Sequence, residues 1–311
     1  MKRRRRLHFK KGFYILVLVV IGIIVSTILY IKHNNYIHSN PYLLKQQGYN
    51  EKEINRVIGN NNIIKVLLSR EYNPYLIDIL ESKYYIESNL DSYIKYKTKY
   101  PDKDYKDVIA IINVTNGKDF YTNEKEVDMS KGDLILVNKY YYLAEDYEPD
   151  DLVNMEVKYA TSNKKVRSHV YDAFKSLVAA AKRSDIKIYA NTTYRTYKAQ
   201  ENAYQNAKNQ KGRAYANTYV ARPGFSEHQT GLAIDVHTSL SNEEFVESET
   251  YKWLVENAST YGFILRYPKD KEYLTGFKFE PYHLRYVGVD VAKQIEKEGI
   301  TFDEYYAYYV R

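Results

Sequence analysis

Two short segments of the chain carry residues whose types and spacing could do chemistry. In the first, His228 precedes Asp235 by seven residues, and in the second, Glu280 precedes His283 by three. Two imidazoles and a carboxylate make a nitrogen and oxygen ligand set, and three such ligands with an open fourth position are what a catalytic zinc site needs. The sequence therefore predicts that His228, Asp235 and His283 could bind one Zn²⁺.

Glu280 supplies the further carboxylate that such a site requires. Zinc lowers the pKa of water towards about 7, and a nearby carboxylate must take the released proton and deliver it to the leaving group. The alternative is that each histidine is an ordinary hydrogen-bonded residue on a strand. The chain has no cysteine, which excludes disulfides, thiolate catalysis and cysteine-based metal sites. Any metal site must therefore use histidine and carboxylate ligands.

The elements that would position these residues can be read from the same segments. Leu232, Ile234 and Val236 alternate with Gly231, Ala233 and Asp235, which is typical of a strand with one apolar face. The small residues beside Asp235 leave room for a metal and its ligands. Pro281 interrupts the second segment, so the relative facing of Glu280 and His283 cannot be read by alternation. His237 falls on the Asp235 face, at the rim of the expected site or just behind the ligands.

Along the surrounding chain, segments with the apolar period of a helix are interspersed with segments typical of strands. This mixture favours one α+β domain. We expect strands at 107–114, 134–137, 186–194 and 277–287, and helices at 163–183, 197–208, 250–261 and 289–298. Residues 43–100 indicate instead a small helical module that contains no candidate catalytic residues. Pro74 interrupts this stretch, and Pro101 follows it.

The two segments resemble the VanY-type D-alanyl-D-alanine carboxypeptidases, a family of the LAS zinc peptidases. The family pattern Ser-x-His-x-x-Gly-x-Ala-x-Asp matches residues 226–235, and its Glu-x-x-His matches residues 280–283. An expected upstream Tyr-Arg pair is found at Tyr194 and Arg195, and Gln200 follows as in related sequences. Thr192 and Thr193 stand where the family often has Ser or Gly. The resemblance covers about residues 105–300.

The resemblance implies a fold of the Hedgehog and D,D-peptidase type, and it implies a role for each matching residue. His228, Asp235 and His283 would bind Zn²⁺, and Glu280 would be the general base and acid. Arg195 would hold the substrate or stabilise the oxyanion, since a guanidinium presents paired donors to such groups. Ser226 and Gln200 are plausible helpers in substrate binding, although Ser226 could equally cap a turn and Gln200 could lie on a helix surface.

The expected substrate is a peptidoglycan stem peptide, from which the enzyme would remove the C-terminal D-alanine. A first rival is an L,D-carboxypeptidase that acts on tetrapeptide stems with the same zinc machinery, because the motifs do not separate the two. A second is a non-catalytic binding module that keeps a metal. The presence of Glu280 with all three ligands argues against that module.

The positive charge of the chain is confined to its N-terminus. Eight of the 46 basic residues fall in the first 32 residues, which contain no Asp or Glu, so residues 33–311 hold 38 basic and 39 acidic residues. This distribution argues against nucleic-acid binding, which needs clustered cations on the folded part. Residues 13–31 are uncharged and would span about 28 Å as a helix, close to a bilayer core.

We expect residues 13–31 to be an uncleaved signal anchor, because a secretory signal peptide has a shorter apolar region and a small-residue cleavage site. The basic residues 1–12 would then stay in the cytoplasm, and the rest of a single-pass membrane protein would lie outside. The expected domains are the tail at 1–12, the membrane anchor at 13–31, a helical module at 32–102 and the zinc peptidase domain at 103–311.

Overall fold

The structure is a computed structural model that describes residues 11–236 and 239–310. The chain divides into two compact units between Tyr85 and Ile86. The basic residues 1–10 and His237, which the sequence singled out, lie outside the described residues.

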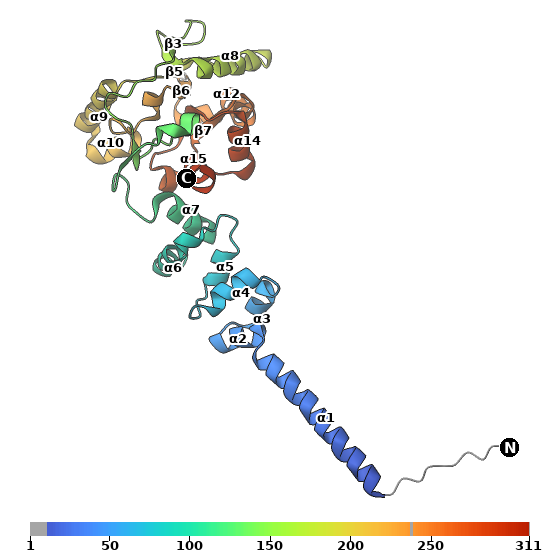
Figure 1. The fold of residues 1–311 in the computed structure, drawn as a ribbon. Helices are drawn as coiled ribbons and strands as arrows, with labels where there is room; N and C mark the ends of the chain where they lie inside the picture. Colours follow the sequence, from blue (N-terminus) through green and yellow to red (C-terminus); the bar gives the residue numbers. More distant parts are fainter. Residues whose placement is uncertain (1–10, 237–238, 311) are drawn as a thin grey trace, which may run out of the picture. The chain divides into compact units, whose positions relative to one another are not determined.

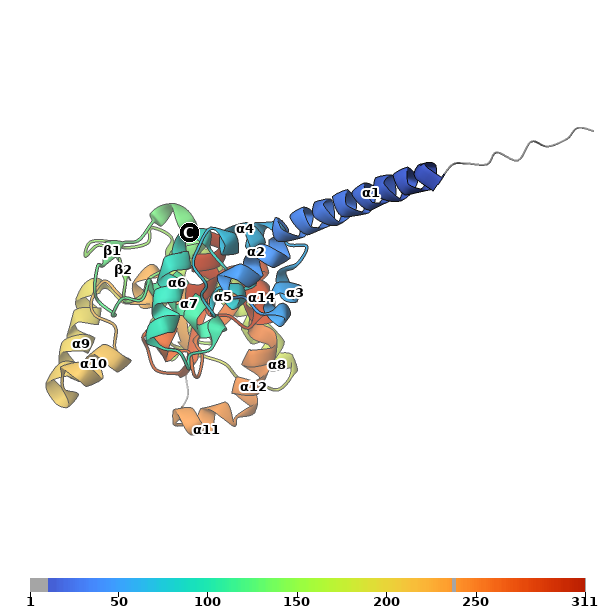
Figure 2. The same ribbon diagram turned by 90° about the horizontal axis from the view of Figure 1, so that it is seen from below.

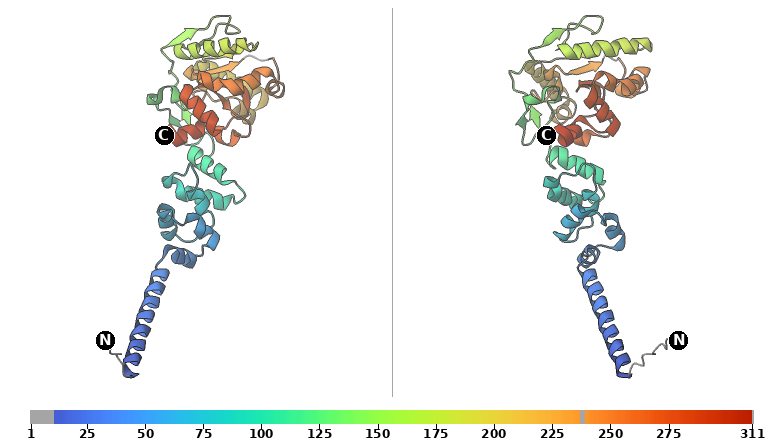
Figure 3. Two further views of the ribbon diagram at one scale, coloured as in Figure 1. Left: turned by 90° about the vertical axis from the view of Figure 1, so that its right-hand side faces the viewer. Right: turned by 45° about the vertical axis from the view of Figure 1, so that its right-hand side comes forward.

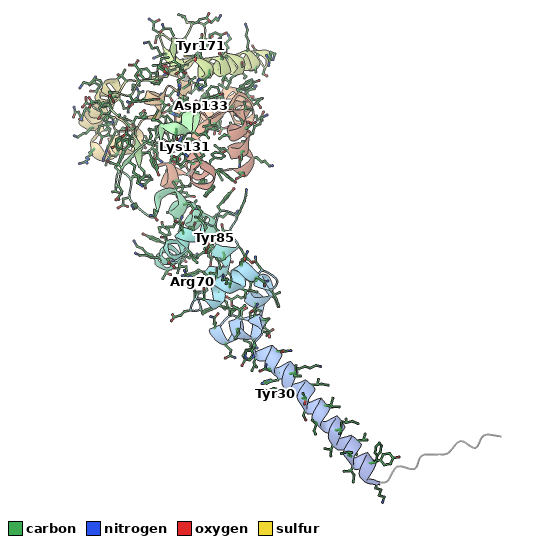
Figure 4. All side chains as sticks on the ribbon, in the orientation of Figure 1. Tyr30, Arg70, Tyr85, Lys131, Asp133 and Tyr171 are labelled. Carbon is green, nitrogen blue, oxygen red and sulfur yellow. The ribbon has the colours of Figure 1, made fainter. Side chains whose placement is uncertain are left out.

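The first unit begins with one long apolar helix, α1 (Lys11–Ile37), drawn as a continuous helix in both views of Figure 3. Its mean hydropathy reaches 2.8, and none of that stretch is buried. Tyr30, labelled in Figure 4, projects away from the helix. The helix is long and apolar enough to cross a membrane, and a signal sequence at this position has the same properties.

Four short helices complete the first unit. They are α2 (Asn40–Gln47), α3 (Glu51–Val57), α4 (Asn61–Leu68) and α5 (Leu76–Leu80). Asn50 and Glu53 form a capping box at the start of α3, as their three-residue spacing predicts. Each helix places apolar residues in a shared core, among them Leu44, Val57, Leu67, Leu76 and Ile79. The helices that the sequence predicts in this stretch are confirmed.

The second unit mixes helices and strands, as the sequence predicts. Its helices are η1 (Glu87–Asn89), α6 (Leu90–Lys99), α7 (Tyr105–Thr115), η2 (Met129–Leu134), α8 (Ser168–Arg183), α9 (Tyr197–Lys211), α10 (Arg213–Tyr219), η3 (Glu227–Thr230), α11 (Asn242–Val246), α12 (Glu249–Asn257), η4 (Ala258–Tyr261), α13 (Glu272–Thr275), α14 (Val289–Glu298), α15 (Phe302–Tyr305) and η5 (Tyr306–Val310). Its strands are β1 (Lys125–Glu126), β2 (Tyr141–Tyr142), β3 (Leu152–Asn154), β4 (Lys165–Arg167), β5 (Ala190–Thr192), β6 (Ala233–Val236), β7 (Phe263–Tyr267) and β8 (Glu280–Tyr286).

An antiparallel four-stranded sheet, in the order β5-β6-β8-β7, organises this unit. One face of the sheet is apolar and carries Leu232, Ile234 and Leu284 into the main core. The amphipathic α8 covers this face with Val170, Phe174, Leu177 and Ala181, and Figure 1 shows it beside β5 and β6. The opposite face is therefore left for polar residues. At another edge of the unit, α9 and α10 lie side by side (Figure 2).

Two predicted strands are wrong. Residues 107–114 lie in α7, where almost every position is buried. A continuous apolar run has no period that separates a buried strand from a buried helix, whereas Asp104 at the N-cap and the left-handed Asn116 at the C-cap mark a helix. In the segment 134–137, Leu134 ends η2 and the next three residues form no strand. There the carbonyl oxygen of Ile135 accepts a hydrogen bond from the Arg285 side chain instead of from a neighbouring strand.

Candidate metal centre

His228 is presented by a short, tightly specified turn. Ser226 caps η3 by accepting a hydrogen bond from the backbone N–H of His228, and Gly231 ends the turn in the left-handed region at φ +68°. A Cβ added at Gly231 would stand 2.8 Å from Cγ of Arg167. Backbone strain and lack of space both require glycine here. The motif thus encodes the turn as well as the ligand.

Asp235 and His283 are brought together by strand register. In the antiparallel pair of β6 and β8, Asp235 lies directly opposite His283, so both side chains leave the same face of the sheet. Nδ1 of His283 is 2.9 Å from Oδ1 of Asp235, and Nε2 of His228 is 3.3 Å from Oδ2. One ligand atom from each of the three residues lies within 4.8 Å of the others. The three predicted ligands therefore form one cluster.

The hydrogen bond at the outer nitrogen of His228 fixes which nitrogen faces the cluster. Nδ1 of His228 lies 2.9 Å from the carbonyl oxygen of Thr193. A carbonyl can only accept, so we assign the proton to Nδ1, which leaves the lone pair of Nε2 directed towards Asp235. Metal-binding histidines commonly use a backbone carbonyl in this way to orient the ring.

The cluster fits a zinc ion by the chemistry of its donors. Oδ1 of Asp235 is buried and, although Nδ1 of His283 lies 2.9 Å away, forms no hydrogen bond in the described part of the chain. Burial alone would lower the pKa of His283, but Asp235 and Glu227 outweigh burial and raise it to about 10. The carboxylates therefore favour positive charge at this point. Two imidazoles and one carboxylate around that point suit Zn²⁺.

Glu280 lies beside the cluster, and its surroundings raise the pKa of its carboxyl group. Its Oε2 is 3.6 Å from Nδ1 of His283. Burial raises the pKa of Glu280 to about 7, with His283 opposing and Asp235 reinforcing the shift. A carboxyl group with a pKa near the working pH can both accept and return a proton. The structure thus brings Glu280 to the place that its motif predicted.

Arg195 and Gln200 lie next to each other rather than on an open surface. Nη1 of Arg195 donates to Oε1 of Gln200 at 2.7 Å, and Nε2 of Gln200 donates to the carbonyl of Ala221 at 2.7 Å. Gln200 is buried. Burial lowers the pKa of Arg195, while Asp235 and Glu280 raise it, which places the guanidinium within electrostatic reach of the cluster.

The sequence did not point to a set of buried charges behind the cluster. These residues are Glu227, Arg266, Arg285 and Asp303, and all are almost completely inaccessible. The sequence signal that could have revealed them is a charged residue between apolar neighbours in a strand, as at Arg266 in β7 and Arg285 in β8. His169 contacts Asp151 and also Asp133, which is labelled in Figure 4.

Comparison with known proteins places this site in a family. The family model of VanY, described as D-alanyl-D-alanine carboxypeptidase, matches residues 163–289. The putative carboxypeptidase YodJ of Bacillus subtilis is 42% identical over 181 residues, which cover 56% of this chain and 66% of that protein. The D-alanyl-D-alanine carboxypeptidase of Enterococcus faecalis is 32% identical over 193 residues, 59% of this chain and 69% of that protein.

A solved structure supports the same assignment. The LD-carboxypeptidase LdcB has 39% sequence identity and a TM-score of 0.56, and the match covers 60% of this chain and 91% of that one. The histidine and aspartate cluster, the adjacent glutamate and these matches define a metallopeptidase domain. The chain belongs to the VanY family of carboxypeptidases, whose members are zinc enzymes.

Proposed function

We propose that this chain is a zinc-dependent carboxypeptidase that removes the C-terminal D-alanine from peptidoglycan stem peptides. The observation that carries the proposal is the cluster of His228, Asp235 and His283 with the half-buried Glu280 beside it. The similarity to enzymes named for D-alanyl-D-alanine hydrolysis supports the choice of substrate.

Each residue of the cluster has a distinct part in this proposal. Nε2 of His228, a carboxylate oxygen of Asp235 and Nδ1 of His283 would hold the ion, which when bound supplies Lewis-acid chemistry for the scissile carbonyl. The Glu280 carboxylate takes a proton from the attacking water and returns it to the leaving amine. Burial raises the pKa of Glu280 and so strengthens the carboxylate as a proton acceptor.

Arg195 recognises the substrate through its guanidinium in this proposal. A planar pair of N–H donors matches the free C-terminal carboxylate of the peptide or the oxyanion that develops during attack. Gln200 uses both ends of its amide within the protein, on Arg195 and Ala221. Its part is therefore to hold Arg195 in place, and Ser226 similarly maintains the turn before His228.

The remaining parts of the chain fit a membrane-tethered enzyme. The exposed, apolar α1 would be the anchor, with residues 1–12 in the cytoplasm and the catalytic residues outside. We propose that 32–102 is a spacer module and 103–311 the peptidase domain. We further propose that this domain has the peptidase-like fold found in Hedgehog proteins.

The bond that is cut separates the two enzyme candidates. The similarity to the LD-carboxypeptidase LdcB favours, as a second candidate, cleavage of tetrapeptide stems. Zinc-loaded full-length protein in detergent should be incubated with pentapeptide and tetrapeptide stems, and the products weighed by mass spectrometry. We expect loss of one D-alanine from the pentapeptide and none from the tetrapeptide. The reverse result assigns the L,D activity, and no loss from either would leave only the non-catalytic module.

A further inference from the structure

Glu227 lies immediately before the predicted ligand His228 and is held by two buried arginines. Its Oε1 accepts hydrogen bonds from Nε of Arg266 at 2.7 Å and from Nη1 of Arg285 at 2.8 Å. Arg266 in turn donates through Nη1 to Oδ2 of Asp303 at 2.6 Å. These four side chains are removed from solvent. Burying so many charges is costly unless each one is paired.

The second oxygen of Glu227 faces the second nitrogen of His283. Oε2 of Glu227 and Nε2 of His283 are 3.5 Å apart, a few tenths of an ångström beyond a hydrogen bond. Within the described residues, neither atom has a hydrogen-bond partner, and neither is accessible to water. Nη2 of Arg266 is another buried donor without a partner among the described residues of this network, so the 3.5 Å approach carries the pairing of Oε2 with Nε2 of His283, and buried polar atoms are as a rule hydrogen-bonded.

We propose that Glu227 is a positioning residue for the metal centre, whose Oε2 accepts the Nε2–H of His283 and so directs the Nδ1 lone pair to the metal. This inference rests on the proposed metal site. It gives His283 the same kind of support that the Thr193 carbonyl gives His228. Outer hydrogen bonds of this kind fix the tautomer and orientation of metal-binding histidines.

The two arginines determine what Glu227 can offer to His283. Both donate to Oε1, at 2.7 and 2.8 Å. Oε2 is therefore the oxygen left to accept from His283. Glu227→Gln would replace the acceptor that faces His283 by a donor. The arginine donors require the new amide oxygen, so the amide NH₂ must face His283. Nε2 would then have to accept, which moves the ring proton to Nδ1.

The test measures zinc affinity by competition with a chelator, using full-length protein in detergent. Glu227→Gln is expected to weaken zinc binding by about 10- to 100-fold, the usual effect of losing an outer partner of a ligand. Asp303→Asn is the matched control, because it removes a charge from the same network on the far side of Arg266. It should lower the thermal unfolding midpoint and leave zinc affinity unchanged.

Two outcomes would overturn the proposal. One is wild-type zinc affinity in Glu227→Gln. The other is an equal loss of affinity in Asp303→Asn, which would make the network a general support of the fold. Neither readout depends on hydrolysis, so an inactive chain with the expected zinc affinities would contradict the proposed function and leave the role of Glu227 standing.

A second measurement needs no variant. In the zinc-loaded wild type, nitrogen-15 NMR of labelled histidines should find a proton on Nε2 of His283 that exchanges slowly with solvent. A His283 ring without such a protected Nε2 proton would contradict the proposed hydrogen bond, whether or not Glu227→Gln folds.

Discussion

At the residue scale, Asp235 joins the two halves of the site. Its carboxylate lies within 3.3 Å of one histidine and 2.9 Å of the other, although the two histidines are far apart in the sequence. Glu280 lies on the other side of His283 from Glu227, so one imidazole has a carboxylate near each of its nitrogens. In the proposed site a carboxylate thus serves as metal ligand in Asp235, as proton carrier in Glu280 and as orienting group in Glu227.

The proton-carrying role of Glu280 predicts a separation of binding from turnover. Glu280→Ala should keep zinc, because the three ligands remain, and should lower kcat by at least about 10²- to 10⁴-fold, the typical contribution of a general acid or base. Zinc content by atomic absorption and hydrolysis of a pentapeptide stem would check this. Near-normal turnover in this variant would show that another group moves the proton.

At the element scale, the turn around Gly231 holds His228 against the sheet. Gly231→Ala should destabilise the protein by more than the ~1–3 kcal/mol that backbone strain alone costs, because its Cβ would also meet Arg167 and Leu152. Gly299→Ala is the matched control, since Gly299 also ends a helix at positive φ but has nothing within 4 Å of the added Cβ.

Urea unfolding midpoints of the two glycine variants would measure the difference. We expect the lower midpoint for Gly231→Ala. Equal midpoints would mean that the side chains of Leu152 in β3 and Arg167 in β4 move aside without lowering stability, which would contradict the prediction.

Lys139 bonds to backbone carbonyls of two helical segments, and its lowered pKa predicts that stability depends on pH. Its Nζ donates to the carbonyls of Asn217, at 2.6 Å, and Gly276. Burial lowers the pKa of Lys139 to about 8, below the value of about 10.4 in an unfolded chain. Between these values the unfolded state binds more protons, so stability should rise with pH from about 8 to about 10.4.

Lys139→Met should lose this part of the pH dependence. Relative to the variant, the wild type should gain up to about 3 kcal/mol across the window, and the gain should be lost again as pH falls towards 8. Unfolding midpoints at pH 7.5 and 10 would measure it, with Lys187→Met, at an exposed position, expected to follow the wild type. Parallel changes in wild type and Lys139→Met would contradict the assignment.

At the scale of the whole molecule, the sequence allowed the site to be predicted better than the elements around it. Two local motifs carry the ligands and Glu280, because each motif keeps its spacing along one chain segment. Glu227 could not be paired with Arg266 and Arg285 in the same way, since that contact depends on the register of β7 against β8. The helix at 105–115 was misread because burial on all sides removes its period.

The central claim is that these residues make the chain a zinc carboxypeptidase. The most direct test measures D-alanine release from a pentapeptide stem by the full-length protein as purified, after removal of metal with a chelator, and after zinc is restored. We predict release, loss of release and recovery, in step with zinc content. Release that persists in the metal-free protein, or none from protein holding one zinc per chain, would contradict the account.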